Sequence, residues 1–552
     1  MPEAEPRPDP TPDPPPDPPP AAPQHPGPRP PGPADRRRTV VGYVIALAVL
    51  STCTAVGSIL VEFPITWPQT AWGVLLLLFG ASLLVFTAVM LPFLDKFVAT
   101  IASRLERLPG TLRRRRDNLK KPVRLVTAVL AAVLVAGTAV VVQPPAGPLD
   151  LEPGELTILS AFDESPSDPR RILINQWNQT HPDNQVIIED VPGEPDQQHE
   201  RMVNDASPKG GHEADVYVLD VVWMPEFIQN DFIRPLNESL RSSRDEEFLP
   251  NVLATCRDLY GNREGTWALP LNSDAGLLFY RAGVEPPTRW DDYLGSSARD
   301  ALVRARTDPA VVDGAALQAA SAAQFSEEEI LTVTALEAIW AAGGEVVNRD
   351  GKVVLNEDSS AVEFDDRARD AMKDLASAYV DRDLTLEDAK DADEDRAVSA
   401  FNDGRTLFMR NWPVTYDKLV NSSGRDAVPF EVTALPGPSA LGGQNLAISK
   451  WSRKPRAAQA FVEFLTNSSS QLILFEVGGF APTRGTVYAD SSGMSRPYAQ
   501  DLRTAVERAR PRPVTPKYIA FSSEFRRGVL RALRNGGEFE QDFPQQLAAS
   551  LR

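Results

Sequence analysis

Three polar residues, Asn272, Ser273 and Asp274, interrupt an otherwise apolar stretch of the chain. The apolar runs on either side, Trp267 to Leu271 and Leu277 to Tyr280, predict two buried strands. An amide and a carboxylate at such a step can hydrogen-bond a small polar molecule, because both accept and the amide also donates. This pattern suits a chain that crosses between two lobes, with its polar side chains facing the cleft between them.

Two acidic residues occupy comparable positions nearer the N-terminus. Asp163 follows a predicted strand over Leu156 to Ser160, and Asp220 ends a predicted strand over Asp215 to Asp220. In α/β sheets ligands bind beyond the carboxyl ends of the strands, which is where both carboxylates would lie. The alternative is that each one caps the helix that follows its strand. A cap can also line a cleft, so both interpretations stay open.

Helical patterns alternate with these strands and predict an α/β layer with a largely parallel sheet. Farther along, the Ala-rich stretch from Ala310 to Ala342 predicts a helix, and a Gly/Pro loop separates two more strands. The expected helices are Pro169 to Thr180, His199 to Ala206, Pro225 to Gln229, Ala361 to Val380 and Ala457 to Leu465, and the other strands are Gln185 to Asp190, Val432 to Pro436 and Asn445 to Ser449.

The N-terminal part of the chain has a different composition. Residues 1–34 contain seventeen of the fifty prolines and cannot bury a core, so residues 1–38 are expected to form a proline-rich cytoplasmic tail. Such a tail is either disordered and solvated or a ligand for a proline-binding module. Three uncharged apolar segments follow, each close to the length that spans a bilayer, and they are Val40–Val61, Ala71–Leu94 and Leu125–Val142. The transmembrane helices expected around them are residues 39–63, 71–94 and 123–143.

Charged residues around these segments predict their orientation. The loop 95–122 is strongly basic and includes Arg113 to Arg116, whereas residues 62–70 contain no Lys or Arg. The positive-inside rule places the basic loop and the N-terminus in the cytoplasm, and three crossings place residues 147–552 outside the cell. A lipoprotein signal ending at Cys53 is the alternative. Thr52 before that cysteine and the apolar run beyond it argue against lipidation.

The exterior part, 147–552, excludes several classes of function. It contains 42 Lys and Arg against 65 Asp and Glu, a net charge of −23, which disfavours nucleic acid as a partner. Cys256 is its one cysteine, so it has no internal disulfide and must rest on a large core. The four histidines of the whole chain, three of which lie in this part, show no metal-ligand spacing. We therefore expect neither a metal nor another cofactor.

Motifs spread over this part resemble the extracellular solute-binding proteins of ABC importers, the family that includes maltose- and trehalose-binding proteins. The resemblance begins near Leu156 and extends to the C-terminus, and the order and spacing of the motifs carry it together. These motifs are Leu156–Asp163 with Arg170–Pro182, Asp215–Trp223, Leu269–Arg281, Trp340–Glu345, Phe401–Pro413, Gly442–Ser449 and Ala481–Arg484.

The resemblance implies an α/β, two-lobed, periplasmic-binding-protein-like (type II) domain whose lobes are joined by hinge strands and close on a ligand. The first lobe would comprise about 155–270 and 434–500, and the second about 272–432. The first crossing would fall near Trp267–Asn272 and the return near Thr433–Pro438. Carboxylates, amides and Arg pair with sugar hydroxyls, and aromatic faces stack on the apolar side of a pyranose ring.

Carried over by motif, the resemblance adds further ligand-binding candidates to Asp163, Asp220, Asn272 and Asp274. Trp412 would stack on a sugar, or else belong to the core. Gly442 and Gly443 would let the backbone approach the ligand, or else form only a turn. Arg484 would bind the ligand, or else pair with a surface acid. Many relatives have a Tyr-Glu-Gly-Leu segment whose Glu contacts ligand; here Glu328, Glu329, Ile330 and Leu331 keep the acid, as Glu329, but not the aromatic or the glycine.

The function implied by the resemblance is capture of an oligosaccharide, maltose- or trehalose-like, for ABC-transporter uptake, with permease subunits in the membrane as partners. The departure at Glu328–Leu331 keeps a non-sugar ligand open. One alternative is a membrane-tethered sensor that uses the same binding fold to regulate a partner. An extracellular hydrolase is a third hypothesis, because a glycosidase needs two carboxylates at a set separation and acids are abundant. We predict a binding protein and no enzyme.

Overall fold

The computed structural model describes residues 151–163, 165, 167–308, 311, 317–421, 428–489 and 496–552. The chain divides into two compact units, Met1–Pro145 and Ala146–Arg552, and every described residue belongs to the second. The predicted proline-rich tail and the three predicted membrane spans lie outside the described residues. Within the described ranges, none of the helices combines the length and the apolarity needed to cross a bilayer.

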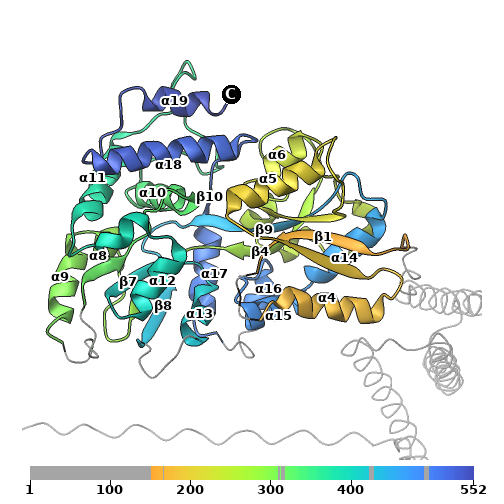
Figure 1. Ribbon diagram of the computed structural model, residues 1–552, viewed down its shortest axis with the longest axis horizontal. Helices are drawn as coiled ribbons and strands as arrows, with labels where there is room; N and C mark the ends of the chain where they lie inside the picture. Colours follow the sequence, from red (N-terminus) through yellow and green to blue (C-terminus); the bar gives the residue numbers. More distant parts are fainter. Residues whose placement is uncertain are drawn as a thin grey trace, which may run out of the picture. The chain divides into compact units, whose positions relative to one another are not determined.

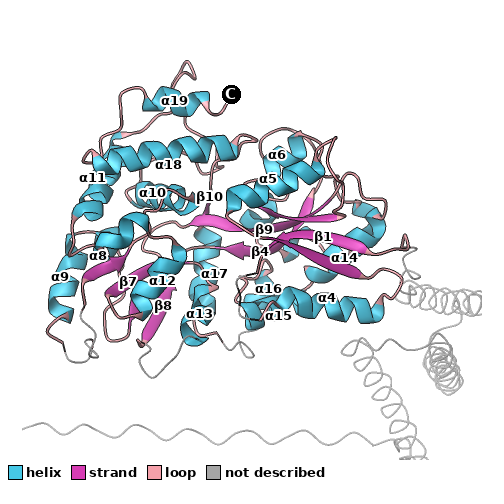
Figure 2. Cartoon of the chain, viewed as in Figure 1, coloured by secondary structure: helices cyan, strands magenta, loops and turns pink. Residues whose placement is uncertain are grey.

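The second unit contains two sheets, each covered by helices (Figures 1 and 2). The first sheet has the order β10-β9-β3-β1-β2, with β4 also paired to β9. The second has the order β6-β7-β5-β8. The strands of the first sheet are β1 (Leu156–Ala161), β2 (Val186–Val191), β3 (Val216–Asp220), β4 (Ala268–Asp274), β9 (Ala440–Ile448) and β10 (Arg510–Pro511), and those of the second are β5 (Leu277–Arg281), β6 (Ala319–Ala322), β7 (Thr406–Asn411) and β8 (Phe430–Ala434).

The prediction of a largely parallel sheet holds only in part, because parallel and antiparallel pairs are mixed in the first sheet. Strand β1 is parallel to β2 and β3, as expected for strands joined through α-helices, but β9 is antiparallel to both β3 and β4. In the second sheet β5 is antiparallel to both of its neighbours. The chain comes back from the second sheet to the first before it forms β9. Strand β9 therefore runs opposite in direction to β3 and β4. Parallel pairs join β1 with β2 and β3, and also β9 with β10 and β6 with β7, so both sheets are mixed.

Helices fill the connections and the outer faces. Helix α4 begins at Pro169, where proline suits the first turn and the Asp168 side chain accepts from the Arg171 N–H. The helices are α4 (Pro169–Thr180), α5 (Pro195–Ala206), α6 (Met224–Gln229), α7 (Pro250–Ala254), α8 (Trp290–Leu294), α9 (Ser296–Ala305), α10 (Glu329–Ala341), α11 (Asp366–Val380), α12 (Glu394–Asn402), α13 (Thr415–Asn421), α14 (Pro455–Leu465), α15 (Ser468–Gly478), α16 (Gly485–Ala489), α17 (Ala499–Arg508), α18 (Tyr518–Arg534) and α19 (Phe543–Ala549), with three short 3₁₀ turns, η2 (Glu238–Leu240), η3 (Asp245–Glu247) and η4 (Glu387–Asp391).

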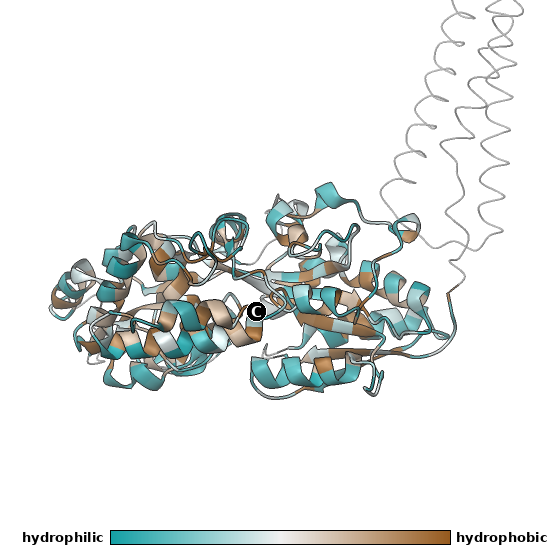
Figure 3. Cartoon of the chain, turned by 90° about the horizontal axis from the view of Figure 1, so that it is seen from above, coloured by the Kyte–Doolittle hydropathy of each residue, from teal (hydrophilic) through white to brown (hydrophobic). Residues whose placement is uncertain are grey.

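Two hydrophobic cores define two lobes, seen side by side from above in Figure 3. The first core forms around β1, β3 and β4 and includes Leu156, Val216 and Leu269. The second forms around β5, β7 and α10 and includes Phe279 and Leu336. We call these lobe 1 and lobe 2. The chain passes between them from β4 to β5 and returns from β8 to β9.

The structure corrects two predictions near these passages. Asn272, Ser273 and Asp274 do not interrupt a strand, because β4 continues through all three and pairs with β9 as far as Asp274 opposite Gly442. The chain leaves the first sheet only at Ala275 and Gly276. The expected Gly/Pro loop before Asn445 is shorter than predicted, because it is confined to Leu435–Ser439 and β9 begins at Ala440.

The expected helix from Ala310 to Ala342 is also wrong in its first half. Residues Ala319–Ala322 form strand β6, which is parallel to β7, and the helix begins at Glu329. Alanine favours helix in isolation, so pairing with the neighbouring strand overrides the local preference here. Small side chains suit this strand because all four of its residues are buried.

Candidate functional site

Asp163 and Asp220 lie at the carboxyl ends of β1 and β3. Asp163 accepts the Ser165 N–H at 2.7 Å and forms an ion pair with Arg170 Nε at 3.3 Å. Burial raises the pKa of Asp163, although Arg170 opposes that rise. Asp220 accepts the Val222 N–H at 3.1 Å. Each carboxylate therefore holds the turn that follows its strand, while the cap of helix α4 is a different residue, Asp168.

Asn272 and Asp274 are neighbours on one face of β4. The Asn272 side chain is buried, and its Nδ2 donates to Asp274 Oδ2 at 3.2 Å. Asn272 Oδ1 is buried without a hydrogen-bond partner among the described residues. Burial, followed by the charge of Asp220, raises the pKa of Asp274 to about 7, against the opposing charges of Arg410 and Arg512. An acceptor without a partner beside a carboxylate that exchanges its proton near neutrality can recognise hydroxyl groups.

Gly442 and Gly443 lie on β9 directly opposite this pair. A Cβ on Gly442 would come within 3.1 Å of Asp274 Cβ and 3.5 Å of the Trp412 ring. Gly443 has φ +112°, and a Cβ there would collide with the Asn272 carbonyl oxygen. The two glycines therefore permit the close approach of β4 and β9, which sets the polar pair of β4 beside the indole of Trp412.

Trp412 follows the last residue of β7 and is half-buried. Its Nε1 donates to Glu394 Oε1 at 3.2 Å. The Arg410 guanidinium lies over the indole ring, with its Cζ 3.8 Å from the centroid. Burial also raises the pKa of Glu394. The indole is therefore held by a carboxylate at its edge and a cation over one face.

The Arg410 guanidinium is held in place by the carboxylate of Glu337 on α10. Its Nε and Nη2 donate to the two Glu337 oxygens at 3.0 and 2.8 Å, and both side chains are almost fully buried. The Ser439 hydroxyl and the Ala440 N–H, on the return passage to lobe 1, each donate to Glu337 Oε1 at 3.0 Å. This carboxylate therefore ties together α10, β7 and the start of β9.

Glu329, at the start of α10, accepts from Arg512, Tyr518 and Ser522. Arg512 also donates from Nη2 to Asp220 Oδ1 at 2.8 Å, so one guanidinium connects the carboxylate of β3 with that of α10. Burial alone would lower the pKa of Arg512, but the neighbouring carboxylates raise it overall. The fixed charges around Asp274 thus come from both lobes.

Comparison with known proteins identifies this architecture. The family model described as bacterial extracellular solute-binding protein matches residues 164–472, more than half of the chain. The chain belongs to this family. Its members bind a solute and do not transform it, so this solute-binding protein is not an enzyme.

One relative and two solved structures illustrate the similarity. A probable ABC transporter-binding protein of Deinococcus radiodurans is 27% identical over 339 residues, which cover 58% of this chain and 75% of the relative. The maltose-bound structure of T. maritima MalE3 is 25% identical with a TM-score of 0.59, covering 72% of this chain and 98% of that one. The GacH receptor of Streptomyces glaucescens shares the fold, at 21% identity and a TM-score of 0.56 over 72% of this chain and 97% of its own.

In this solute-binding protein the predicted site residues are not all in one place. Six of them lie around the β4–β9 pairing. Glu329 is joined to Asp220 of this group only through Arg512, and Asp163 lies at the same edge of the sheet, paired with Arg170. The six are Asp220, Asn272, Asp274, Trp412, Gly442 and Gly443.

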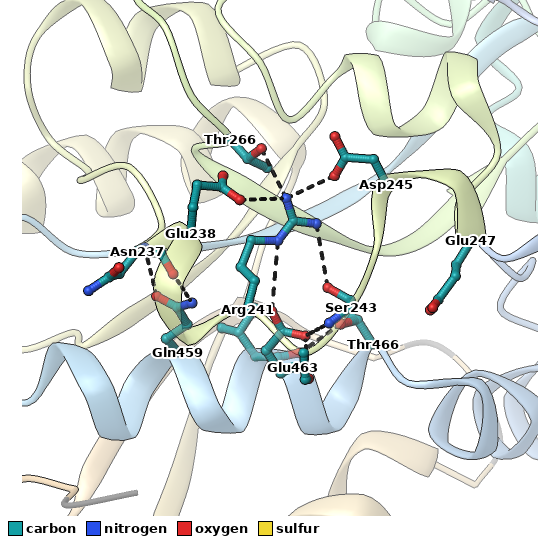
Figure 4. Close-up of polar contacts among 12 residues, drawn as sticks. Asn237, Glu238, Arg241, Ser243, Asp245, Glu247, Thr266, Gln459, Glu463 and Thr466 are labelled. Atoms are coloured by element: carbon teal, nitrogen blue, oxygen red, sulfur yellow. Dashed lines mark hydrogen bonds and ion pairs between the residues drawn. The ribbon is translucent and has the colours of Figure 1, made fainter. Parts of the chain in front are cut away.

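Arg484 lies elsewhere in lobe 1. It is buried, forms an ion pair with Glu247, and donates from Nε to the Thr466 carbonyl oxygen at 2.5 Å. Glu247 and Thr466 border a second cluster in which Arg241 is enclosed by acids, with Asp245 at 2.8 Å and Glu238 at 3.2 Å (Figure 4). The structure shows no contact between Arg484 and the six residues at β4–β9. Its described contacts fix the segment that follows α15.

Sequence reasoning missed three residues near the site. Arg410 and Arg512 supply its positive charges, and Glu394 anchors the indole. Arg410 stands two positions before Trp412, so strand alternation could have placed both side chains on one face. Nothing in the local sequence indicates that Arg512 reaches Asp220, which is 292 positions away.

Two cavities have linings that do not include the six residues at β4–β9. One of about 20 Å³ adjoins this group and is lined by Val222, Leu441 and Arg512, among others. The other, of about 360 Å³, lies between the segment before α11 and the segment between α18 and α19, and is lined by Phe364, Arg369 and Phe539, among others. Neither is lined by Asp274 or Trp412. The chemistry at β4–β9 and the larger cavity are therefore separate features.

Proposed function

We propose that residues 147–552 capture an oligosaccharide, maltose- or trehalose-like, between the two lobes and deliver it to the permease subunits of an ABC importer. The observation that carries this proposal is the placement of Trp412 beside Asn272 and Asp274. A pyranose needs an aromatic face for its apolar side and amide or carboxylate groups for its hydroxyls, and this group offers both. The maltose-bound relative of the same fold supports the class of ligand.

In this proposal the nine candidates have different tasks. Asp220, Asn272 and Asp274 pair with hydroxyls, Trp412 stacks on a ring, and Gly442 and Gly443 keep the approach open. Asp163, which is buried, holds the turn at the end of β1 through Ser165 and Arg170. Glu329 and Arg484 are committed to protein partners in the structure, so they position the elements around the ligand.

In this proposal the N-terminal part attaches the binding domain to the cell. The three uncharged segments within residues 39–143 would anchor the chain in the cell membrane as a multi-pass protein, with its N-terminus in the cytoplasm and the binding domain outside. The proline-rich tail would then be available to cytoplasmic partners. This feature favours a second candidate function, a tethered sensor that signals ligand occupancy through the basic loop 95–122 and the tail.

A thermal-shift screen of di- and trisaccharides against the purified chain tests the proposal. We expect at least one α-linked glucose disaccharide or trisaccharide to raise the melting temperature, and Trp412→Ala to weaken its affinity by about tenfold in calorimetry through lost stacking. Trp451→Ala is the matched control, because Trp451 stacks on His212 outside the site. If no sugar shifts the wild-type protein, the carbohydrate assignment fails.

Deletion of the gene separates the two candidate roles. Loss of sugar uptake supports delivery to an importer. Intact uptake with altered gene expression supports the sensor.

A further inference from the structure

The C-terminal segment from Arg510 to Arg534 belongs to both lobes. It pairs through β10 with the first residues of β9, Arg510 opposite Ala440, and then forms α18. Phe521, Phe525 and Val529 of α18 pack in the core of lobe 2, whereas Tyr518, at the first position of the same helix, packs in the core of lobe 1. The helix therefore starts in one lobe and continues along the other (Figure 1).

Arg512 forms the first charged link between the lobes. Its side chain is 4% exposed, and it contacts Asp220 of lobe 1 at 2.8 Å and Glu329 of lobe 2 at 2.9 Å. Tyr518 and Ser522 donate to the same Glu329 and hold its carboxylate in place. Separation of the lobes would pull this guanidinium away from one of its two carboxylates, which is unfavourable for a buried charge.

Arg526 forms the second link, about two helical turns beyond Tyr518. Its Nη2 lies 2.6 Å from Asp196 Oδ2, at the start of α5. Helix α5 belongs to lobe 1, because Met202 and Ala206 pack in that core. The Arg526 side chain is mostly buried and Asp196 is partly exposed, so this pair is weaker and more sensitive to salt than the first.

We propose that the segment from Arg512 to Arg526 is a latch that holds the two lobes together in the absence of solute. The proposal concerns the motion of the lobes and does not depend on which solute the cleft takes. Because both arginines are carried by one segment, the two links break together when the lobes separate. The latch raises the population of the arrangement in which Asp220, Asp274 and Trp412 lie near one another, so less of the binding energy is spent on bringing the lobes together.

Electron–electron resonance distances between nitroxide labels, measured without solute on the full chain in detergent, test this proposal. Ile187→Cys on β2 and Val303→Cys on α9 provide one exposed label in each lobe. Cys53→Ser removes the other reactive thiol, and Cys256 is fully buried. We expect one main distance in the latched protein. Arg526→Gln should raise the ratio of the longer to the shorter distance about threefold, and Arg512→Gln about tenfold or more.

Matched variants distinguish the latch from a general loss of structure. Arg527→Gln is the control on the same helix, because among the described residues Arg527 pairs within α18, with Glu524 at 2.7 Å, and it should leave the distances unchanged. The exchanged pair Arg526→Glu with Asp196→Arg should restore the shorter distance. Identical distance distributions in wild type, Arg526→Gln and Arg512→Gln overturn the proposal, whatever the outcome of the sugar screen.

Discussion

Two buried arginines near the junction of the lobes, Arg410 and Arg512, satisfy their charges in opposite ways. Arg410 makes a two-pronged contact with Glu337 inside lobe 2, and its partner also binds the passage to β9. Arg512 divides its donors between Asp220 of lobe 1 and Glu329 of lobe 2. The Arg410 charge is neutralised within lobe 2. The Arg512 charge keeps both of its carboxylate partners only while lobe 1 and lobe 2 stay in contact.

This difference shows how one cleft can be both rigid and mobile. The Arg410–Glu337 pair does not need to change when the lobes move. It can therefore keep the Trp412 ring, which lies against the Arg410 guanidinium, in one position. The contacts of Arg512 must change, so their strength enters the free energy of lobe motion. Substitutions at the first arginine should therefore affect unfolding, and those at the second should affect conformation.

The largest expected effect is on the rigid pair. Glu337→Gln leaves the Arg410 guanidinium buried without its counter-charge, and we expect the free energy of unfolding to fall by about 3–5 kcal/mol. Denaturant unfolding followed by circular dichroism measures it. Glu345→Gln is the control, because Glu345 pairs with Arg510 but is 40% exposed, and it should cost less than about 1 kcal/mol. Equal losses in the two variants would contradict the assignment of Arg410 as the rigid member.

A smaller loss of stability should follow when an added methyl group presses on Arg410. A Cβ on Gly276 would lie 2.7 Å from Arg410 Nε and Nη2, and that guanidinium cannot retreat because Glu337 and Trp412 hold it. We expect Gly276→Ala to cost about 1–3 kcal/mol of unfolding free energy. In Gly485→Ala the new methyl would meet, within the described part of the chain, only Leu249 at 3.7 Å. Similar stabilities for the two alanine variants would show that Arg410 is free to move.

The smallest expected effect is a pH dependence at Asp274, which feels both arginines. Its pKa is about 7 in the folded protein against an ordinary 3.8, so the folded state keeps a proton that the unfolded state releases. The contribution of Asp274 to stability is therefore greatest at low pH and falls as the pH rises from about 4 to about 7. The side chain in Asp274→Asn stays neutral at every pH. The melting temperature of this variant should therefore rise relative to that of wild type across this window, by about a few degrees.

Combining this titration with the second arginine sharpens the comparison. Arg512 lowers the pKa of Asp274, so Arg512→Gln should move the window to higher pH. Melting temperatures at half-unit intervals from pH 4 to pH 8.5, for wild type, Asp274→Asn, Arg512→Gln and the double variant, provide the measurement. A difference between wild type and Asp274→Asn that stays constant with pH would show that Asp274 is solvated and far from both arginines.

Helices and strands were predicted well where the signals for them, such as prolines and apolar runs, lie within the element itself. Helix α4 has the predicted bounds, because Pro169 suits its first turn and Pro182 follows its end. Strand β1 was likewise indicated by its apolar run. Strand β6 was missed, because four small residues become a strand only beside β7. The two-lobed α/β fold followed from the motifs together, and the family match confirms it.

The candidate site was predictable to a smaller extent. Strand ends and polar steps indicated Asp220, Asn272 and Asp274, and their role as ligand contacts stays a prediction. Arg512 could not be found this way, because its carboxylates come from β3 and α10, far away in the chain. Arg484 shows the converse, since its motif drew attention while its contacts lie with Glu247 and Thr466. Long-range ion pairs leave no local periodicity in a sequence.

The position of β9 also has a consequence for how the chain folds. Val216 of β3 pairs with Ile448 of β9, roughly 230 residues later, and α18 completes the opposite lobe later still. Such distant pairings are slow, because a long loop must close before any contact forms. While the chain is still emerging, β3 has an open apolar edge that other chains can join. We expect refolding to be slow and prone to aggregation, and a chain truncated before Ala440 to be insoluble.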